Sequence, residues 1–260
     1  MDREDLVLEI IYAAQSLKGV RENNQDNYFV NGYIRKLDEP STFLYGTSHR
    51  NTQLFAVCDG MGGESKGNEA SFMAVHYLQS EPISCLESQF EKEILILNDI
   101  IWKYAKSRKL HMGTTFAGVL FHKGCLQLIN LGDSRVYQIR NHAVTQISHD
   151  HTEIQALIEA GVLKKDDYVY KKAGNRITQY LGAPSHELAL NPYVLEIVPK
   201  DGDRYLLCSD GLSSFIANSD IAEICLKNNV KIACQQMIKR ALEQGSTDNI
   251  TAVLIEIHLS

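Results

Sequence analysis

The sequence lacks several features that would assign it to a specialised class of protein. Its 260 residues carry a formal net charge of -6, so there is no broad basic excess to neutralise the phosphates of a nucleic acid. The N-terminal stretch opens with acidic side chains, and its apolar run is interrupted by Glu9 and is too short to span a bilayer. These absences predict a cytoplasmic protein that binds neither nucleic acid nor membrane.

The six cysteines are widely scattered, and no CxxC pair occurs. This distribution favours reduced, mostly buried thiols over a disulfide framework or a zinc ribbon. The sequence also has no internal repeat, no low-complexity tract and no linker rich in proline, glycine or serine. We therefore expect a single domain over residues 1–260, which is long enough to bury a sizeable core.

Short apolar runs, rich in β-branched or aromatic residues and bounded by Gly, Asp or Asn, predict many strands. Helical stretches come in pairs after groups of strands, which predicts an α+β fold of antiparallel sheets stacked face to face with helices outside. The expected helices cover residues 68–79, 91–106, 152–161, 219–228 and 231–245.

In the last helical stretch, apolar residues recur every four positions and predict one buried helix face that ends at Gly245. They are Ala233, Met237 and Ala241, beside Cys234, Ile238 and Leu242. Residues 31–53 are predicted to form a polar hairpin extension, and residues 150–186 a helix-containing excursion from the strands.

The stretch "FAVCDGMGGESKGNEAS" ends an apolar run on Asp59, and three glycines follow within four positions. A dinucleotide fingerprint would need glycine at Ser65, and a P-loop counted from Gly62 would need lysine at Asn68. Both nucleotide-binding interpretations are therefore disfavoured. Either Asp59 caps a tight turn, or it stands beside a backbone that can approach a ligand closely.

Four more aspartates stand at strand borders: Asp26 and Asp248 ahead of strands, and Asp133 and Asp210 after them. Each one alone can be explained as a turn residue. If they converge with Asp59 at one end of the sheets, they repel one another unless cations neutralise them. Such oxygen ligands favour Mg²⁺ or Mn²⁺ over Zn²⁺, and two ions sharing a carboxylate can activate a water for attack on phosphorus.

At these residues the sequence resembles the metal-dependent PPM-type (protein phosphatase 2C) serine/threonine phosphatases, in their bacterial form. The resemblance implies a four-layer α-β-β-α sandwich with a flap at about 150–186 beside the active site. It also implies that a metal-bridging hydroxide hydrolyses phosphoserine and phosphothreonine in proteins, at a centre of two Mn²⁺ or Mg²⁺ ions. Eight motifs match in order: "GVRENNQDN", "DGMGGESKGNEAS", "MGTTF", "LGDSRVYQIR", "ISHDHTEIQALIEAGVL", "NRITQYLG", "GDRYLLCSDGLS" and "GSTDNITAVLI".

The resemblance assigns a role to each matched residue. Asp59 would bridge both ions, and the carbonyl of Gly60 would bind one of them. Asp210 and Asp248 would hold the other ion, whereas Asp26 would act largely through metal-bound waters. Arg21, with Asp59 one of the two catalytic residues, would bind the substrate phosphate as a bidentate cation.

Three positions depart from the family pattern. Met61 stands where some relatives have a histidine that protonates the leaving serine oxygen, which methionine cannot do. Bacterial members usually have an aspartate where this chain has Ser214, and that aspartate helps Asp133 to hold a third metal, so only a weak third site is expected. Gln25 replaces a commonly acidic neighbour of Asp26.

Two further clusters allow alternative interpretations. His149 and His151 flank an aspartate, but no third zinc ligand stands at a convincing spacing, so we favour a structural role. Four lysines of the predicted flap either contact phosphoprotein or form a solvated surface. They are Lys164, Lys165, Lys171 and Lys172.

Other functions remain open at this point. Ser214 and Met61 suggest a pseudophosphatase that binds a partner without turnover, and the lack of a recognisable docking module suggests a hydrolase of small phosphoesters. The favoured function is that of a protein phosphatase, expected to be a monomer that opposes a serine/threonine kinase.

Overall fold

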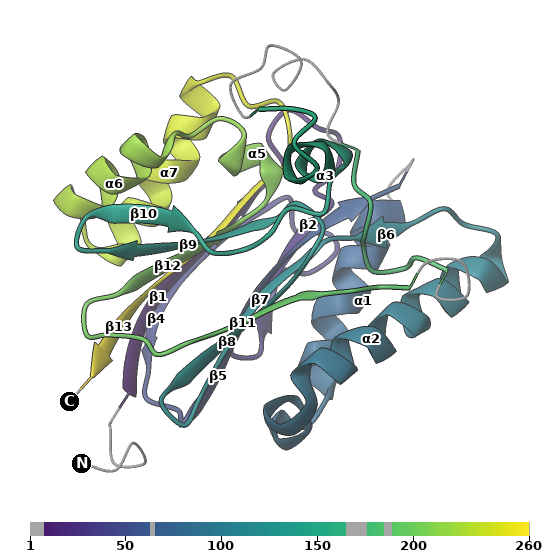
Figure 1. The fold of residues 1–260 in the computed structure, drawn as a ribbon, viewed down its shortest axis with the longest axis horizontal. Helices are drawn as coiled ribbons and strands as arrows, with labels where there is room; N and C mark the ends of the chain where they lie inside the picture. The colour runs from purple at the N-terminus through teal and green to yellow at the C-terminus, as the bar shows by residue number, and fades with distance from the viewer. Residues whose placement is uncertain (1–7, 63–65, 165–175, 185–188, 260) are drawn as a thin grey trace.

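The computed structural model of the chain describes residues 8–62, 66–164, 176–184 and 189–259. Their strands pair into two antiparallel sheets that stack face to face (Figure 1). In spatial order, the first sheet contains β10 (Ala143–Gln146), β9 (Arg135–Arg140), β12 (Arg204–Cys208), β13 (Ile250–Leu259), β1 (Leu8–Leu17) and β4 (Ser41–Ser48). The second contains β11 (Tyr193–Ile197), β8 (Cys125–Leu131), β7 (Phe116–His122), β5 (Thr52–Met61), β2 (Asp26–Val30) and β3 (Tyr33–Ile34), and β6 (Gly113–Thr114) pairs with β5.

The central strands are buried on both faces, which explains why their sequences are nearly continuous apolar runs. On β5, Phe55 and Val57 point into the core between the sheets, whereas Leu54, Ala56 and Cys58 point toward the helices. This alternation follows from the two-residue period of a strand. Each sheet therefore has one face for its partner sheet and one face for a helical layer.

Helices cover both outer faces (Figure 1). The second sheet packs against α1 (Lys66–Ser80) and α2 (Ile83–Arg108), and the first against α6 (Asn218–Lys227) and α7 (Val230–Glu243). The short helices α3 (Glu153–Glu159) and α5 (Asp210–Ser213) lie near one end of the strands. The predicted four-layer α-β-β-α sandwich is thus confirmed. Among the helices in the described ranges, none is long and apolar enough to cross a membrane.

Helix α7 confirms most of the predicted buried face. The side chain of Asn229 accepts a hydrogen bond from the backbone N–H of Ile232 and caps the N-terminus. Beyond the C-terminus, Gly245 adopts φ +90°, as expected for a helix stop. The predicted apolar positions are buried except Leu242, which is 40% exposed because it lies at the margin of the stripe.

The prediction of a polar hairpin extension over residues 31–53 is wrong. After the β2–β3 hairpin the chain crosses to the other sheet, where β4 pairs with β1, and then returns in β5. Alternate residues of β4 point inward, and Leu44 packs against the core between the sheets. The polar composition of the segment concealed this strand period.

The predicted excursion over residues 150–186 does begin with a helix, α3. Residues 165–175 lie outside the described part of the chain, so the flap stays a prediction. The five cysteines whose side chains are described are free thiols, and four of them are buried, as predicted.

The core between the sheets is centred on an aromatic cluster. The ring of Phe55 lies 6.0 Å from that of Tyr12 and 6.1 Å from that of Phe121, which in turn lies 6.0 Å from that of Tyr205. Such tilted and edge-on contacts stabilise the core beyond the area that they bury.

We expect Phe55→Ala to lower the free energy of unfolding by about 3–5 kcal/mol, because it leaves a cavity that the two sheets cannot close. The matched change Phe43→Ala, at a side chain that is 39% exposed on β4, should cost less than about 1 kcal/mol. Urea titrations measure both values. Equal losses would contradict the assignment of the main core to the layer between the sheets.

Candidate metal centre

The strand pairing of the second sheet brings two of the predicted ligands together. Asp26 is the first residue of β2, and in the antiparallel register it stands directly opposite Asp59, near the end of β5. Directly opposed residues have Cα atoms about 4.5–5.5 Å apart. Two carboxylates that are distant in the sequence are therefore neighbours at one end of the sheet.

The first sheet contributes two more carboxylates at the same end of the sandwich. Asp210 begins α5 just after β12, and Asp248 precedes β13, which pairs with β12. Gly211 allows the two segments to touch, since a Cβ atom there would lie 1.9 Å from the carbonyl oxygen of Asn249 and 3.4 Å from Cβ of Asp248.

Hydrogen bonds then connect the two sheets at this end. Ser209 Oγ, at the end of β12, donates to Asp26 Oδ2 at 2.6 Å. Arg21, in the loop before β2, contacts Asp248 Oδ2 through Nη2 at 2.6 Å, and 57% of its side chain is exposed. The structure thus gathers Asp26, Asp210 and Asp248 where the sequence predicted, with Arg21 at the solvent-facing rim.

The cluster is electrostatically unfavourable without positive charge. Burial raises the pKa of Asp26 to about 7, and the charges of Asp210 and Asp248 add to the rise. Burial and then the charges of Asp26 and Asp210 raise the pKa of Asp59 well above its usual range. For Asp210 the pKa is raised by burial and by the charge of Asp248. Nearby like charges have this effect unless cations compensate them.

Asp133 lies in the turn between β8 and β9 and is 5% exposed. Burial raises the pKa of its carboxyl to about 7, with contributions from the charges of Asp210 and Asp150. Its carboxyl is thus close enough to Asp210 for the two charges to interact. Ser214 is exposed at the C-terminal end of α5, and its backbone N–H donates to the carbonyl of Asp210.

One atom of the cluster is suited to bind a cation. Asp26 Oδ1 is buried and has no hydrogen-bond partner among the described residues, and such a group is costly without a compensating charge. In the described ranges, no three His, Cys, Asp or Glu side chains could hold an ion by themselves. That does not suit a closed zinc site, but Mg²⁺ keeps several waters and binds through one or two carboxylates.

The glycine-rich stretch serves close packing of backbone against backbone. A Cβ atom at Gly60 would lie 2.1 Å from the carbonyl oxygen of Gly67 and 2.6 Å from that of Gln25. Gly62 adopts φ +148°, which L side chains rarely adopt. The first turn of α1 therefore lies directly against the end of β5. Residues 63–65 lie outside the described part of the chain.

Gln25 has a structural role rather than a place among the acids. Its carbonyl accepts hydrogen bonds from the N–H of Gly60 at 3.1 Å and from Ser71 Oγ at 2.6 Å. Its side-chain amide donates to the carbonyl of Gly62 at 3.3 Å. The side-chain hydrogen bond to Gly62 needs an amide donor and no negative charge. Met61 is half-buried.

Two buried polar side chains that the sequence did not single out hold the site in place. Arg35 is fully buried and donates to the carbonyls of Asn24 and Asp26 and to Asn68 Oδ1 of α1, at 2.8–2.9 Å. Asn249 accepts from the N–H of Gln25 at 2.8 Å and donates to two carbonyls of the loop that carries Arg21. The position of Asn249 next to Asp248 was a signal in the sequence, whereas nothing in the sequence pointed to Arg35.

Thr115 holds the backbone of Asp59 in place. Its Oγ1 accepts a hydrogen bond from the N–H of Asp59 at 2.9 Å and contacts Ser134 Oγ at 2.6 Å. The backbone N–H of Thr115 donates to the carbonyl of Asp59, also at 2.9 Å. The position of Asp59 is thus determined from both sides of its peptide unit.

The histidines at 149 and 151 have structural contacts. His151 Nδ1 accepts a hydrogen bond from the N–H of Gly132 at 3.2 Å, next to Asp133, and His149 lies 3.3 Å from a carboxylate oxygen of Glu159. These contacts support the structural interpretation over the zinc site. Of the four lysines of the predicted flap, Lys164 is exposed and the other three lie outside the described residues.

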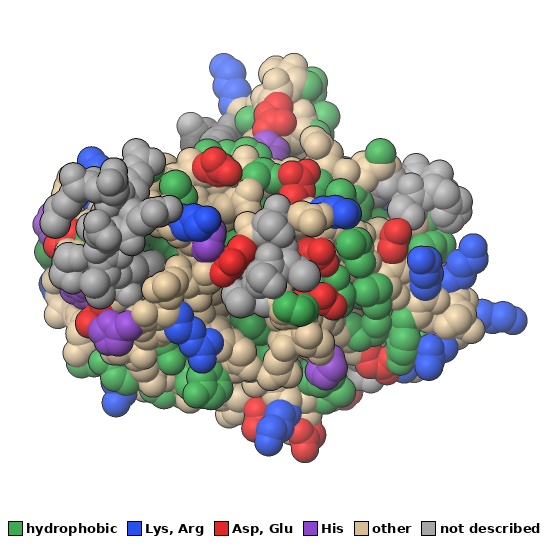
Figure 2. All heavy atoms as spheres, turned by 90° about the horizontal axis from the view of Figure 1, so that it is seen from below, with side chains coloured by type: hydrophobic (Ala, Val, Ile, Leu, Met, Phe, Trp, Pro, Cys, Tyr) green, Lys and Arg blue, Asp and Glu red, His purple; other side chains and the backbone are tan. Residues whose placement is uncertain are grey.

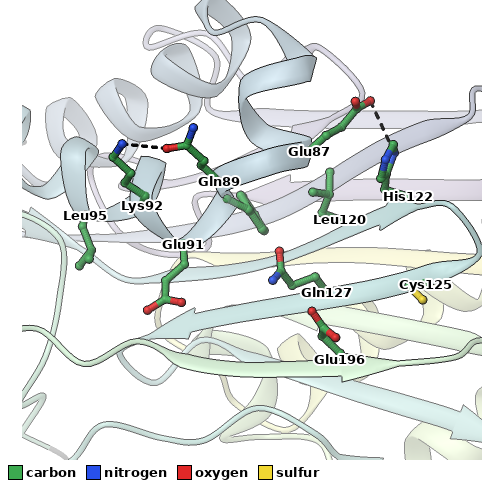
Figure 3. A pocket seen from close by; sticks show the side chains of 11 residues that line it. Glu87, Gln89, Glu91, Lys92, Leu95, Leu120, His122, Cys125, Gln127 and Glu196 are labelled. Atoms are coloured by element: carbon green, nitrogen blue, oxygen red, sulfur yellow. Dashed lines mark hydrogen bonds and ion pairs between the residues drawn. The ribbon is translucent and has the colours of Figure 1, made fainter.

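A separate cleft lies at the other end of the strands. It measures about 570 Å³ between α2 and the second sheet (Figure 3), and it begins near His122, opposite Thr52 of β5. Seven residues of strand separate that end from Asp59, or roughly 24 Å. Figure 2 shows the molecule from this end, with acidic and hydrophobic side chains interspersed. Three glutamates, Glu87, Glu91 and Glu196, outnumber the basic side chains of Lys92 and His122 in the lining. The excess of negative charge does not suit a phosphate group.

Comparisons with known proteins identify the family of the chain. The family model described as Protein phosphatase 2C matches residues 43–254. Serine/threonine protein phosphatase PstP of Mycobacterium tuberculosis is 31% identical over 264 residues, which cover 99% of this chain and 46% of PstP. The chain thus spans about half of that relative. Serine/threonine phosphatase stp of Listeria welshimeri is 30% identical, and the alignment covers 88% of this chain and 93% of stp.

The fold also matches solved structures. The catalytic domain of PstP in complex with two manganese ions aligns with a TM-score of 0.76 at 31% identity, over 96% of this chain and 99% of that one. The serine/threonine phosphatase of S. agalactiae aligns with a TM-score of 0.77 at 26% identity, over 95% of this chain and 98% of that one. The family match, these likenesses and the carboxylate cluster lead to one conclusion: the chain belongs to the protein phosphatase 2C family.

Proposed function

We propose that this protein hydrolyses phosphoserine and phosphothreonine esters in phosphoproteins with the help of two Mn²⁺ or Mg²⁺ ions. The observation that carries the proposal is the meeting of Asp26, Asp59, Asp210 and Asp248 at one end of the sandwich, with a buried carboxylate oxygen that lacks a partner. The relatives named serine/threonine phosphatases supply the substrate class.

The same residues would hold the ions. Asp59 would bridge the two, the carbonyl of Gly60 would bind one, Asp210 and Asp248 would bind the other, and Asp26 would contribute through water. When bound, the two ions activate a water for attack on phosphorus and neutralise the charge that develops there. Asp133 would hold a third ion only weakly, because Ser214 supplies no carboxylate.

Arg21 would bind the substrate phosphate. Its guanidinium is largely exposed and already stands at the rim, 2.6 Å from Asp248. A planar guanidinium matches two phosphate oxygens at once. Asn249 holds the loop of Arg21 against the metal centre, so the phosphate and the attacking water would meet in a fixed geometry.

The intact carboxylate cluster and the phosphatase names of the relatives give the pseudophosphatase no support. Met61 leaves protonation of the leaving oxygen to water.

We further propose that the excursion over residues 150–186 forms a flap beside the site, with Lys164, Lys165, Lys171 and Lys172 facing phosphoprotein. The cytoplasmic location, the monomeric state and the opposing kinase stay predictions.

Replacing Asp210 should abolish turnover while leaving the fold intact. We expect Asp210→Asn to lower kcat/KM for p-nitrophenyl phosphate in Mn²⁺ by about a hundredfold or more, because an ion loses a charged ligand. Asp201→Asn, at an exposed acid outside the site, is the matched control and should retain activity. Full activity of the wild type in EDTA would contradict the metal mechanism.

Rates of hydrolysis of phosphopeptides, compared with those of free phosphoserine, test whether small phosphoesters are the true substrates.

Arg21→Ala should lower kcat/KM for a phosphopeptide by about ten- to a hundredfold, the loss expected for a charge-assisted bidentate contact. Arg50→Ala, which removes an arginine whose side chain donates to the carbonyl of Asn31, is the control. Steady-state kinetics with both variants measure the difference. If Arg21→Ala kept wild-type kinetics, Arg21 would be a solvated loop residue and not a phosphate ligand.

Mn²⁺ should raise the thermal midpoint, and by more at pH 8 than at pH 6. The raised pKa values of Asp26 and Asp133, each about 7, mean that the metal-free folded state keeps protons that the unfolded chain releases above about pH 4. The stability of the metal-free protein therefore falls as the pH rises from about 4 to 7. At pH 8 the carboxyls have already lost these protons, so Mn²⁺ binds without having to displace them. Midpoints in EDTA and in Mn²⁺ give the difference, which Asp59→Asn should reduce. An unchanged midpoint would count against the cluster as a metal site.

A further inference from the structure

A second cleft, of about 460 Å³, opens directly beside the metal centre. Its walls come from the end of β5, the C-terminal half of α2, the loop that leads into β6, and residues 180–184. Most of the side chains that line it are apolar. They include Met61, Trp102, Leu110, Met112 and Tyr180.

The walls of this apolar cleft are built on fixed contacts. Thr114 and Leu181 exchange backbone hydrogen bonds at 3.0 and 2.9 Å. The buried side chain of Asn98 on α2 accepts from the N–H of Gly182 at 2.8 Å and donates to the carbonyl of Ala183 at 3.2 Å. The cleft is therefore preformed, which is typical of a binding site.

Glycine brings two of the walls together. A Cβ atom at Gly113 would lie 2.5 Å from the ring of Tyr180, and one at Gly182 would lie 2.9 Å from both Ile101 Cγ2 and the carbonyl oxygen of Met112. Gly182 also adopts φ +98°. The turn at 181–183 thus sits tightly against β6 and α2, and the cleft is bounded on that side.

The apolar cleft lies close to the metal centre along β5. Met61, which lines it, lies two residues beyond Asp59 on the same strand, or about 7 Å along it. An extended peptide covers the same distance in two residues. A phosphoresidue at the metal centre would therefore place a side chain one or two positions away at the mouth of the cleft.

The charges around the apolar cleft also fit a phosphopeptide. No acidic side chain is among the described residues that line it. The Lys106 ammonium stands 5.7 Å from the ring of Trp102, which lines the cleft. An apolar side chain would enter without burying an opposed charge, and basic flanking residues would be repelled.

We propose that this apolar cleft is a specificity site for the phosphoprotein substrate, which receives a large apolar side chain one or two residues from the phosphoserine or phosphothreonine. The inference rests on the proposed phosphatase function and deepens it by naming a substrate class. Trp102 and Leu110 supply the apolar walls, and Asn98 is a positioning residue that holds the 182–183 turn.

Phosphopeptides test this directly in the Mn²⁺-loaded full chain. One series carries leucine at each of the two positions on either side of phosphothreonine, in an otherwise serine-containing peptide, and the reference peptide has serine throughout. We expect one position at which leucine raises kcat/KM by about tenfold or more, the discrimination that an apolar pocket provides. Equal rates at all positions would overturn the proposal.

Two variants locate the effect. Trp102→Ser should reduce the leucine-to-serine ratio of kcat/KM to nearly one, and because the ratio is measured within one enzyme, general damage cancels. Tyr104→Ser removes a neighbouring aromatic side chain of α2 that does not line the cleft, and it should keep the ratio. A wild-type preference that survives Trp102→Ser would overturn the assignment to this cleft.

The wild-type series keeps the proposal falsifiable even if Trp102→Ser fails to fold, which thermal melts would reveal. Failure of the proposed function looks different. In that case neither the phosphopeptides nor p-nitrophenyl phosphate would be hydrolysed in Mn²⁺, whereas failure of the specificity site alone leaves hydrolysis intact and independent of the flanking residue.

Discussion

Mutual repulsion of buried carboxylates is the constraint on which this structure depends. Burial and like charge raise the pKa values of Asp26, Asp59, Asp133 and Asp210 together. A fold that removes so many acids from water at one place needs protons or cations there. The ions proposed for catalysis would therefore stabilise the ends of the strands as well as act on the substrate.

The frame around this cluster is made rigid by buried polar side chains with several hydrogen bonds each. Hydrogen bonds of Arg35 connect the strand of Asp26 to α1. Those of Asn249 connect the loop of Arg21 to the start of β13, and those of Asn98 connect the turn at 182–183 to α2. Satisfied networks of this kind hold irregular backbone in one conformation. Loops can then present functional groups as precisely placed as those on strands.

Much of this arrangement could be predicted from the sequence, because the signals were local. Aspartates at the borders of apolar runs marked the strand ends, and the order of strands and helices indicated two sheets with helices outside. The sequence could not show that β4 belongs to a different sheet from β3, since pairing partners are set by distant residues such as those of β1. Nor could it single out Arg35, whose burial follows from carbonyls that only the folded chain assembles.

The close backbone contacts at Gly60, Gly67 and Gly211 have a consequence for reading related sequences. Each position lacks room for even a methyl group, so packing alone would preserve these glycines in a descendant that had lost every metal ligand. Glycines retained at these positions therefore indicate only that the fold is retained. Only the carboxylates, whose burial side by side is costly without cations, indicate selection for chemistry.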